Sequence, residues 1–311
     1  MFITVLGSAA GGGYPQWNCN HPNSRRARAG EPPAPMRTQS SLAVSADGVD
    51  WVLFNASPDL RQQINDNSIL HPASAGALRG SPIKAVILTN ADVDHVTGLL
   101  SLRESQAFNL YATPRVHSVL AANSIFNVLN PACVQRSPMA LDLALAVQNA
   151  RGAALGFQVV PFAVPGKVAL WLENAAKGDN FGSVDEDTIA LEVRDAAGAL
   201  KFFYLPACAR MTAELAARLR GAPLIFFDGT LFVDDEMIRD GVGVKTGQRM
   251  GHMSVSGEEG TLRAFRDLEV QRKVFIHINT TNPILIADTP ERSEITAAGW
   301  EVSFDGMRLE V

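Results

Sequence analysis

Metal-capable side chains follow directly on an apolar segment of the chain. The run Lys84–Thr89 is typical of a buried strand, and Asp92, Asp94 and His95 come just after it. Carboxylates combined with imidazole suit non-haem Fe(II) or Mn as well as Zn. Asp is also a preferred helix N-cap, so Asp92 and Asp94 could instead begin a helix near His95. Both interpretations stay open for Asp92, whereas we favour metal ligation for Asp94 and His95.

Further residues of this kind lie in the last third of the chain. Asp228 ends an apolar run, His252 lies in a glycine-containing loop, and His277 falls late in another apolar run. Each has an ordinary alternative, because an Asp can open a turn and a histidine in an apolar strand is often held by backbone hydrogen bonds. Considered together, Asp228 and His252 are candidate catalytic residues, and His277 is a candidate metal ligand.

Two arginines could contact a substrate. Arg37 and Arg61 each offer a planar guanidinium fork, which suits a carboxylate. The alternative for each is an ion pair that only stabilises the structure. We keep both as candidate substrate-binding residues.

The elements that must position these side chains alternate along the whole chain. Apolar runs predict strands at Phe2–Gly7, Ser40–Ser45, Trp51–Asn55, Lys84–Thr89, Phe157–Phe162, Val168–Leu172, Thr188–Val193, Leu200–Tyr204, Leu224–Phe227, Val274–Ile278 and Glu301–Phe304. Helical patterns lie near Pro58–Asn65, Pro114–Asn123, Met211–Arg220, Gly257–Leu268 and Pro290–Ala298. Ser256, followed by two acidic residues, is the expected N-cap of the fourth helix. No linker divides the chain, so we expect one domain over residues 1–311, with sheets sandwiched between helical layers.

Composition excludes several classes of function. A formal net charge of −5 and a pI near 5.7 give no basic surface for nucleic acid. The N-terminus reads as a strand rather than a signal peptide, and no apolar run approaches the roughly 18 residues of a membrane span. The three cysteines are well separated and predict no disulfide framework. We therefore expect a cytoplasmic protein.

The residues after the Lys84–Thr89 strand resemble a known motif. Metallo-β-lactamase-fold proteins carry His-x-His-x-Asp-His at this point, and here the matching positions read Asn90-x-Asp92-x-Asp94-His95. A dinuclear zinc hydrolase builds one of its sites from the two leading histidines, which are absent here. The region around Lys167, where another such ligand could lie, also has no histidine. The Asp-His pair with one distant histidine predicts a single metal.

Fixed strings along the whole chain resemble one narrower family, the pyrroloquinoline quinone (PQQ) biosynthesis protein B family. They occur in the family's order, at Gly7–Asn18, Arg37–Ser41, Asn55–Asp59, Asp94–Glu104, Asp228–Met237, Met250–His252, His277–Leu285 and Phe304–Met307. The resemblance implies an α/β (α+β) fold, the metallo-β-lactamase αββα sandwich, with two mixed β-sheets flanked by helices.

The resemblance also implies a function. An iron-dependent oxygenase would hydroxylate the tyrosine of a Glu-Tyr intermediate derived from a precursor peptide. The alternative is a carrier that takes PQQ or its precursor to the periplasm, and a zinc hydrolase ranks third. The expected partner is a small peptide or quinone-precursor substrate, and a homodimer stays open.

On this basis, each candidate residue has an expected role. Asp94, His95 and His277 hold the metal, which we expect to be Fe(II), with Zn as a surrogate. Asp92 and Asp228 are auxiliary ligands or acceptors beside it. His252 is a catalytic acid or base, because the pKa of histidine suits that work.

The chain departs from the family at a cysteine motif near the N-terminus. Relatives often carry Cys-x-Cys-x-x-Cys after the first string, a spacing suited to a structural zinc. The matching residues here are Cys19, His21 and Ser24. Cys19 and His21 could still ligate zinc, but serine is a poor ligand, so we expect weak or absent metal. An ordinary loop with a free cysteine is the alternative.

Overall fold

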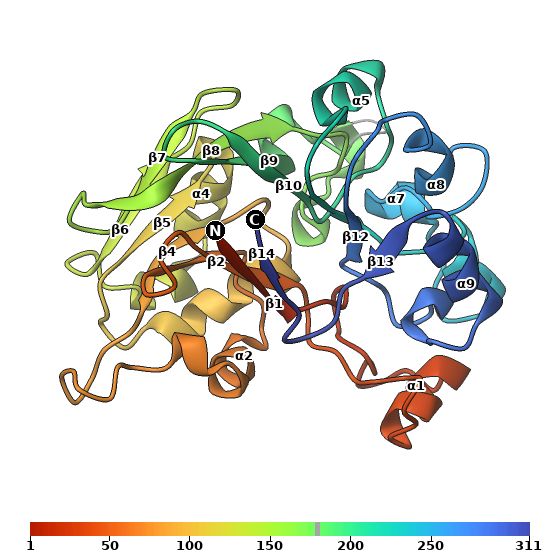
Figure 1. Cartoon of the computed structure of the whole chain (residues 1–311), viewed down its shortest axis with the longest axis horizontal. Coiled ribbons are helices and arrows are strands. Elements are labelled where there is room, and N and C mark those ends of the chain that lie inside the picture. The colour runs from red at the N-terminus through yellow and green to blue at the C-terminus, as the bar shows by residue number, and fades with distance from the viewer. Residues whose placement is uncertain (178–180) are drawn as a thin grey trace.

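Two seven-stranded sheets form the centre of the molecule in a computed structural model, which describes residues 1–177 and 181–311 (Figure 1). The first sheet has the order β14 (Arg308–Glu310), β1 (Phe2–Gly7), β2 (Ser41–Ser45), β3 (Trp51–Phe54), β4 (Ile83–Ile87), β5 (Phe108–Ala112) and β6 (Val134–Pro138). The second has the order β13 (Trp300–Val302), β12 (Lys273–Ile276), β11 (Ile225–Asp228), β10 (Leu200–Leu205), β9 (Ile189–Asp195), β8 (Ala154–Ala163) and β7 (Leu145–Gln148).

Both sheets are mixed, as the family resemblance implies. Strands β3 to β6 run parallel, as do β10 to β13, whereas the remaining pairs are antiparallel. The chain ends lie side by side, because β14 pairs with β1 at one edge of the first sheet (Figure 1). The carboxyl ends of parallel neighbours such as β11 and β12 meet at one sheet edge. Residues that follow those strands are thereby brought together.

Helices cover the outer faces of the sandwich. The α-helices are α1 (Pro22–Arg28), α2 (Leu60–Asp66), α3 (Val93–Val96), α4 (Pro114–Ala121), α5 (Ala213–Leu219), α6 (Glu236–Arg239), α7 (Gly247–Met250), α8 (Thr261–Ala264) and α9 (Pro290–Ala297). Short 3-10 helices lie at Ser68–Leu70, Thr97–Leu102, Ser124–Val128, Leu170–Leu172, Ala175–Lys177, Asp185–Asp187 and Pro283–Leu285. Within the described ranges, no helix has both the length and the apolar character needed to cross a membrane.

Three apolar cores hold the layers together. The middle core joins the facing sides of both sheets, where the rings of Phe54 and Phe202 stack with centroids 6.2 Å apart. A second core packs α2 and α4 on the first sheet, and a third packs α5 and α9 on the second sheet. These layers confirm the expected αββα sandwich.

Two predicted elements were wrong. Val168–Leu172 is not a strand but ends in a 3-10 helix, because it bonds to the loop after β4: Trp171 Nε1 donates to Ala91 O at 3.3 Å. The Gly257–Leu268 helix is only α8, with Gly260 rather than Ser256 as its N-cap residue. Gly257 has a φ of +96°, which no helix interior adopts.

Some elements were missed. Strands β6 and β7 form the outer edges of the two sheets and are partly exposed, so their sequences lack a continuous apolar pattern. Strand β5, the three-residue β14 and helix α1 were also missed.

Candidate metal centre

The candidate metal ligands meet at the edge of the sandwich where several strands end. Asp94 and His95 lie on α3, which follows β4 of the first sheet, whereas His277 directly follows β12 of the second. An isolated bridge pairs Ala9 with Ile278 and so joins the segment after β1 to the loop after β12. Residues far apart in sequence thus reach one place from both sheets.

Asp94, His95 and His277 form one group of metal-capable atoms, each within 4.8 Å of the others. The Asp94 Oδ2 atom lies 3.0 Å from Nε2 of His277 and 3.9 Å from Nε2 of His95. The two imidazole rings approach edge to face, with centroids 5.4 Å apart. The geometry therefore brings together the three residues predicted to hold one metal.

Each imidazole is oriented through its other ring nitrogen. His95 Nδ1 lies 2.7 Å from Oδ1 of Asn90, a pure acceptor, so Nδ1 carries the proton. His277 Nδ1 lies 2.9 Å from Oγ1 of Thr230. A metal-binding histidine is normally fixed in this way by a hydrogen bond from its remote N–H.

The His95 Nε2 atom is buried and has no hydrogen-bond partner among the described residues. A buried polar atom without a partner is costly, and here it faces the carboxylate of Asp94. Burial also lowers the pKa of His95, which leaves this nitrogen with a free lone pair. A metal ion would satisfy this atom, so the donor set fits one.

The two imidazoles keep the carboxylate of Asp94 ionised. Burial alone would raise the pKa of Asp94, but the imidazoles of His95 and His277 outweigh burial and hold that pKa well below its usual range. Burial lowers the pKa of His277, yet the hydrogen bond to Asp94 raises it above its usual value overall. The carboxylate is therefore ionised, as a ligand must be.

His277 has a left-handed backbone, with a φ of +58°. Such a conformation is uncommon for a residue other than glycine and costs of the order of 1 kcal/mol or more. Contacts on both sides hold it in place: Ile278 N donates to Ser8 O at 3.0 Å, and the carbonyl oxygen of His277 lies 3.0 Å from Thr230 Oγ1. The surrounding loops thus impose the direction of this imidazole.

A second group of metal-capable atoms comprises Asp228, His252 and His277. These residues surround the hydroxyl of Thr230, whose Oγ1 lies 2.6 Å from Asp228 Oδ1, 2.9 Å from His277 Nδ1 and 3.1 Å from His252 Nδ1. A protein hydroxyl therefore already binds the atoms that a metal would need. This arrangement supports one metal, at the first group.

Asp228 holds His252 in place. Its carboxylate is fully buried and accepts from Cys208 N at 3.0 Å and Thr230 N at 3.0 Å. Thr230 Oγ1 also donates to it, and Asp228 Oδ2 lies 2.7 Å from Nδ1 of His252. His252 lines the cavity and stacks on His277 with ring centroids 5.1 Å apart. Asp228 is thus an acceptor that orients His252, one of the two roles expected for it.

Asp92 does not join either group in the described part of the chain. It is the N-cap residue of α3, but its side chain makes no capping hydrogen bond. Asp92 Oδ1 instead accepts from Leu170 N at 3.3 Å and lies 3.7 Å from Nζ of Lys167. Asp92 is thus an acceptor that lines the cavity, one of the two roles expected for it, and it ties the segment after Lys167 to the site.

A cavity of about 280 Å³ opens beside these residues. Its walls include Asp92, Asp94, His95, His252, His277 and Thr230, together with Lys167, Lys245, Leu170 and Met250. Sequence reasoning missed Thr230 and the two lysines. The string Asp228-Gly-Thr230 could have indicated that Thr230 belongs to the site. No neighbouring residue in the sequence indicates this for Lys167 or Lys245.

Neither predicted substrate arginine lines this cavity. Arg37 is only 6% exposed, and its Nη1 donates to the carbonyl of Ser303 and to Ser8 Oγ at 3.3 Å. Burial lowers the pKa of Arg37 to about 10. Arg61 is exposed on α2. Arg37 is therefore an interior structural residue, which corrects the expectation.

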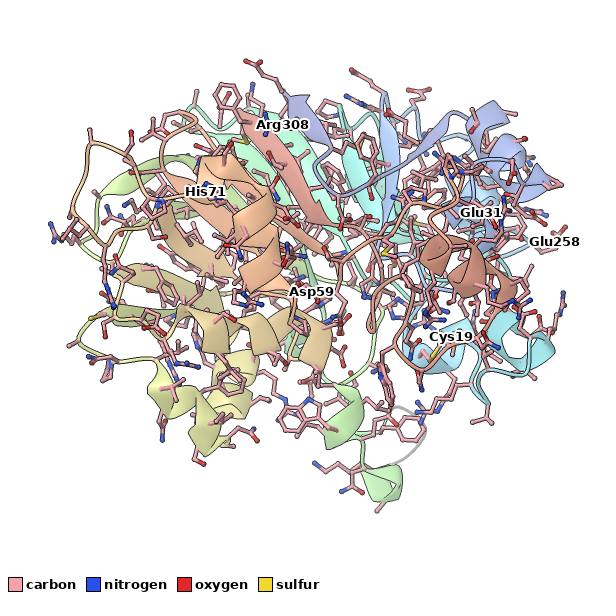
Figure 2. The ribbon with its side chains drawn as sticks, turned by 90° about the horizontal axis from the view of Figure 1, so that it is seen from below. Cys19, Glu31, Asp59, His71, Glu258 and Arg308 are labelled. Carbon is pink, nitrogen blue, oxygen red and sulfur yellow. The ribbon has the colours of Figure 1, made fainter. Side chains whose placement is uncertain are left out.

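Cys19 lies just before α1 (Figure 2), and His21 is the N-cap residue of that helix. His21 Nδ1 caps that helix by accepting from Asn23 N at 3.2 Å, and its Nε2 contacts Asp240 Oδ2 at 3.2 Å. Ser24, at the third position of the family motif, is fully buried and bonds to Thr280 Oγ1 at 2.8 Å. No metal-capable group of three in the described ranges contains Cys19 or His21. Both ring nitrogens of His21 are already engaged.

Comparisons with known proteins agree with this architecture. A family model described as a β-lactamase superfamily domain matches residues 50–278. A coenzyme PQQ synthesis protein B from Gluconacetobacter diazotrophicus is 57% identical over 309 residues, covering 99% of this chain and 98% of that protein. One from Xanthomonas campestris pv. campestris is 53% identical over the full length of both chains.

Solved structures give the same answer. The crystal structure of Zn²⁺-bound PqqB from Methylobacterium extorquens is 48% identical, with a TM-score of 0.93 and complete coverage of both chains. A diphosphatase of the PhnP family is 20% identical with a TM-score of 0.67, covering all of this chain and 96% of that one, and shows the fold alone. The chain therefore belongs to the coenzyme PQQ synthesis protein B family of the β-lactamase superfamily.

Proposed function

We propose that this protein acts in PQQ synthesis as a metal-dependent hydroxylase of the tyrosine in a Glu-Tyr intermediate. The relatives at 57% and 53% identity carry the name of PQQ synthesis proteins, which supports the pathway. The observation that carries the chemistry is the convergence of one carboxylate and two imidazoles, Asp94, His95 and His277, beside a cavity. This donor set is typical of non-haem Fe(II) oxygenases. Because the scaffold differs from theirs, the parallel is one of chemistry.

Asp94, His95 and His277 would hold the metal, and the orphaned Nε2 of His95 supports this assignment. Fe(II) bound there would supply the activation of dioxygen that hydroxylation of an aromatic ring requires. Zinc, which is bound in the Methylobacterium extorquens relative, would serve as a redox-inactive surrogate.

The other residues of the site orient and move protons. Asn90 and Thr230 fix the rings of His95 and His277 through their Nδ1 atoms. Asp228 holds Nδ1 of His252, which leaves Nε2 of His252 to exchange a proton with the tyrosine hydroxyl. Most of the His252 side chain is shielded, since only 14% of it is exposed. A shielded, oriented imidazole is suited to acid/base work.

The site argues against a dinuclear zinc hydrolase. Asn90 stands where such enzymes have a histidine ligand, and here its Oδ1 accepts from His95. The Thr230 hydroxyl occupies the second group of metal-capable atoms. A carrier of PQQ or its precursor remains the second candidate, because the cavity could bind a small anionic ligand without any reaction.

One experiment separates enzyme from carrier. Purified protein is reconstituted with Fe(II) under argon, mixed with Glu-Tyr and ascorbate as the two-electron reductant, and then exposed to ¹⁸O₂. We expect mass spectrometry to show one ¹⁸O atom in the tyrosine ring with Fe(II) and none with Zn(II). His95→Ala should abolish both the bound metal and the product. Absence of product combined with tight binding of PQQ would favour the carrier.

A further inference from the structure

The cavity beside the metal centre has a positively charged side that the proposed reaction has not yet used. Lys167 and Lys245 reach it from two different loops. Among the described lining residues, these two are the only ones with a lysine or arginine side chain. We propose that these two ammonium groups anchor a carboxylate of the substrate and so direct the rest of the molecule toward the metal. The identity of that substrate rests on the proposed function; the anchor itself does not.

Lys167 is held in position by its stem. A Cβ atom added at Gly251 would lie 3.1 Å from Cγ of Lys167, so the two loops pack closely there. The Nζ atom donates one hydrogen bond, to Val168 O at 3.3 Å, and lies 3.7 Å from Oδ1 of Asp92. An ammonium group has three N–H donors. Two of them are therefore available to a ligand, although only 17% of the side chain is exposed.

Lys245 has even fewer partners. Its nearest carboxylate oxygen among the described residues is Oε2 of Glu173, at 3.9 Å, which is beyond hydrogen-bonding distance. Glu173 is instead engaged by Arg249 through two hydrogen bonds of 3.0 and 2.7 Å. Arg249 thus satisfies the carboxylate that could otherwise have neutralised Lys245. Lys245 thus lines the cavity with an ammonium group that makes no hydrogen bond to the described residues.

The chemistry of the walls selects the ligand class. Asp94 makes the metal side of the cavity negative, while Lys245 and Lys167, whose Nζ lies 3.7 Å from Asp92 Oδ1, supply positive charge in its lining. Lysine binds a carboxylate as a compact charge that can adjust its direction. A cavity of about 280 Å³ suits a small acid rather than a protein segment. Both Glu-Tyr and PQQ carry carboxylates, so either source could occupy the anchor.

The test is equilibrium binding to zinc-loaded, full-length protein, which needs no turnover. Three probes are titrated: Glu-Tyr, its C-terminal amide, and PQQ. We expect Lys245→Met and Lys167→Met each to weaken Glu-Tyr binding roughly 10- to 100-fold, as loss of a charged hydrogen bond does. The two Lys→Met substitutions should weaken binding of the C-terminal amide much less than binding of Glu-Tyr. The Lys245→Arg variant should bind Glu-Tyr with most of the wild-type affinity. Lys201→Met is the matched control, because Lys201 pairs with Asp195 outside the cavity and should bind all probes like wild type.

Two outcomes would contradict the proposed carboxylate anchor. In one, Lys167→Met and Lys245→Met bind Glu-Tyr and PQQ with wild-type affinity at wild-type zinc content. In the other, the wild-type protein binds neither Glu-Tyr nor PQQ. A loss confined to PQQ would support the anchor while contradicting Glu-Tyr as the substrate. Lysine-dependent binding of Glu-Tyr without hydroxylation would likewise support the anchor and contradict only the proposed reaction.

Discussion

The Nδ1 atom of His95 lies 2.7 Å from Oδ1 of Asn90, the residue that stands where the superfamily motif has its first histidine. At this position the chain therefore has an amide that orients the His95 ring in place of the motif's histidine. Asn90 Oδ1 also accepts from Asp92 N at 3.0 Å, which fixes the amide's direction. The amide thus determines which His95 nitrogen faces Asp94.

Replacing Asn90 should weaken metal binding without removing a ligand. Asn90→Ala leaves the His95 Nδ1–H without its acceptor, and loss of such a partner typically lowers metal affinity roughly 10- to 100-fold. Asn90→Asp keeps an acceptor at the same place and should bind zinc at least as tightly as wild type. Competition with a chromophoric chelator measures both affinities. Equal zinc affinity in Asn90→Ala and wild type would show that the hydrogen bond does not tune the site.

The Thr230 hydroxyl offers a second test of the single-metal arrangement. Thr230→Val removes the oxygen shared by Asp228, His252 and His277, so His277 loses its orienting partner. We expect zinc affinity to fall roughly 10- to 100-fold in Thr230→Val and to stay near wild type in Thr230→Ser. A second zinc equivalent bound by Thr230→Val would instead mean that the surrounding residues form a metal site of their own.

Much of the site could be predicted because its key residues form a local pattern. Asp94 and His95 are neighbours at a strand end, and that pairing is visible in one short string. His277 lies 183 positions from Asp94, so its position late in an apolar run made it a candidate, while the family's order of strings linked it to Asp94 and His95. Lys167 and Lys245 were not predicted, because their places beside the cavity arise from contacts between separate loops and no residue next to them in the sequence indicates those contacts. Thr230 was also missed, although the string Asp228-Gly-Thr230 was a signal for it.

The fold shows the same division. Central strands such as β4 and β11 are almost entirely buried and have largely apolar sequences, which predicts them directly. Edge strands β6 and β7 carry polar residues because one side faces solvent, so they were missed. Val168–Leu172 is apolar yet forms no strand, because Trp171 bonds to the loop after β4 instead of to a sheet. Tertiary contacts overrode the local pattern there.

Stability should depend on pH through a buried acid, Glu236. Burial raises the pKa of Glu236 from 4.5 to about 7, even though Thr281 Oγ1 and Phe232 N donate to its carboxylate. The folded state therefore holds this proton more tightly than the unfolded state. Below pH 4.5 Glu236 is protonated in both the folded and the unfolded state, so it does not change the free energy of unfolding. That free energy falls as the pH rises from about 4.5 to 7. The full loss is about 3 kcal/mol.

Glu236→Gln removes this titration while keeping an amide that can bond to Phe232 N and Thr281. We expect the free energy of unfolding of the variant, relative to wild type, to increase by about 2 to 3 kcal/mol between pH 5 and pH 8. Denaturant titrations at four or five pH values measure the difference. A difference that stays constant over this range would contradict a raised pKa for Glu236.

The last prediction concerns His252, which lines the cavity and contacts Asp228 but lies outside the group formed by Asp94, His95 and His277. His252→Ala should leave metal content close to wild type, because the three proposed ligands remain. The rate of Glu-Tyr hydroxylation should fall roughly 10²- to 10⁴-fold, as is typical when an acid or base is lost.

Three companion variants make this result specific. Asp228→Asn keeps His252 but weakens the acceptor that orients it, so activity should fall while metal is retained. His95→Ala should remove metal and activity together, whereas His71→Ala, at an exposed residue outside the cavity, should change neither. Loss of metal in His252→Ala would make His252 a ligand rather than an acid/base group. Wild-type turnover in His252→Ala, at full metal content, would exclude it from the reaction altogether.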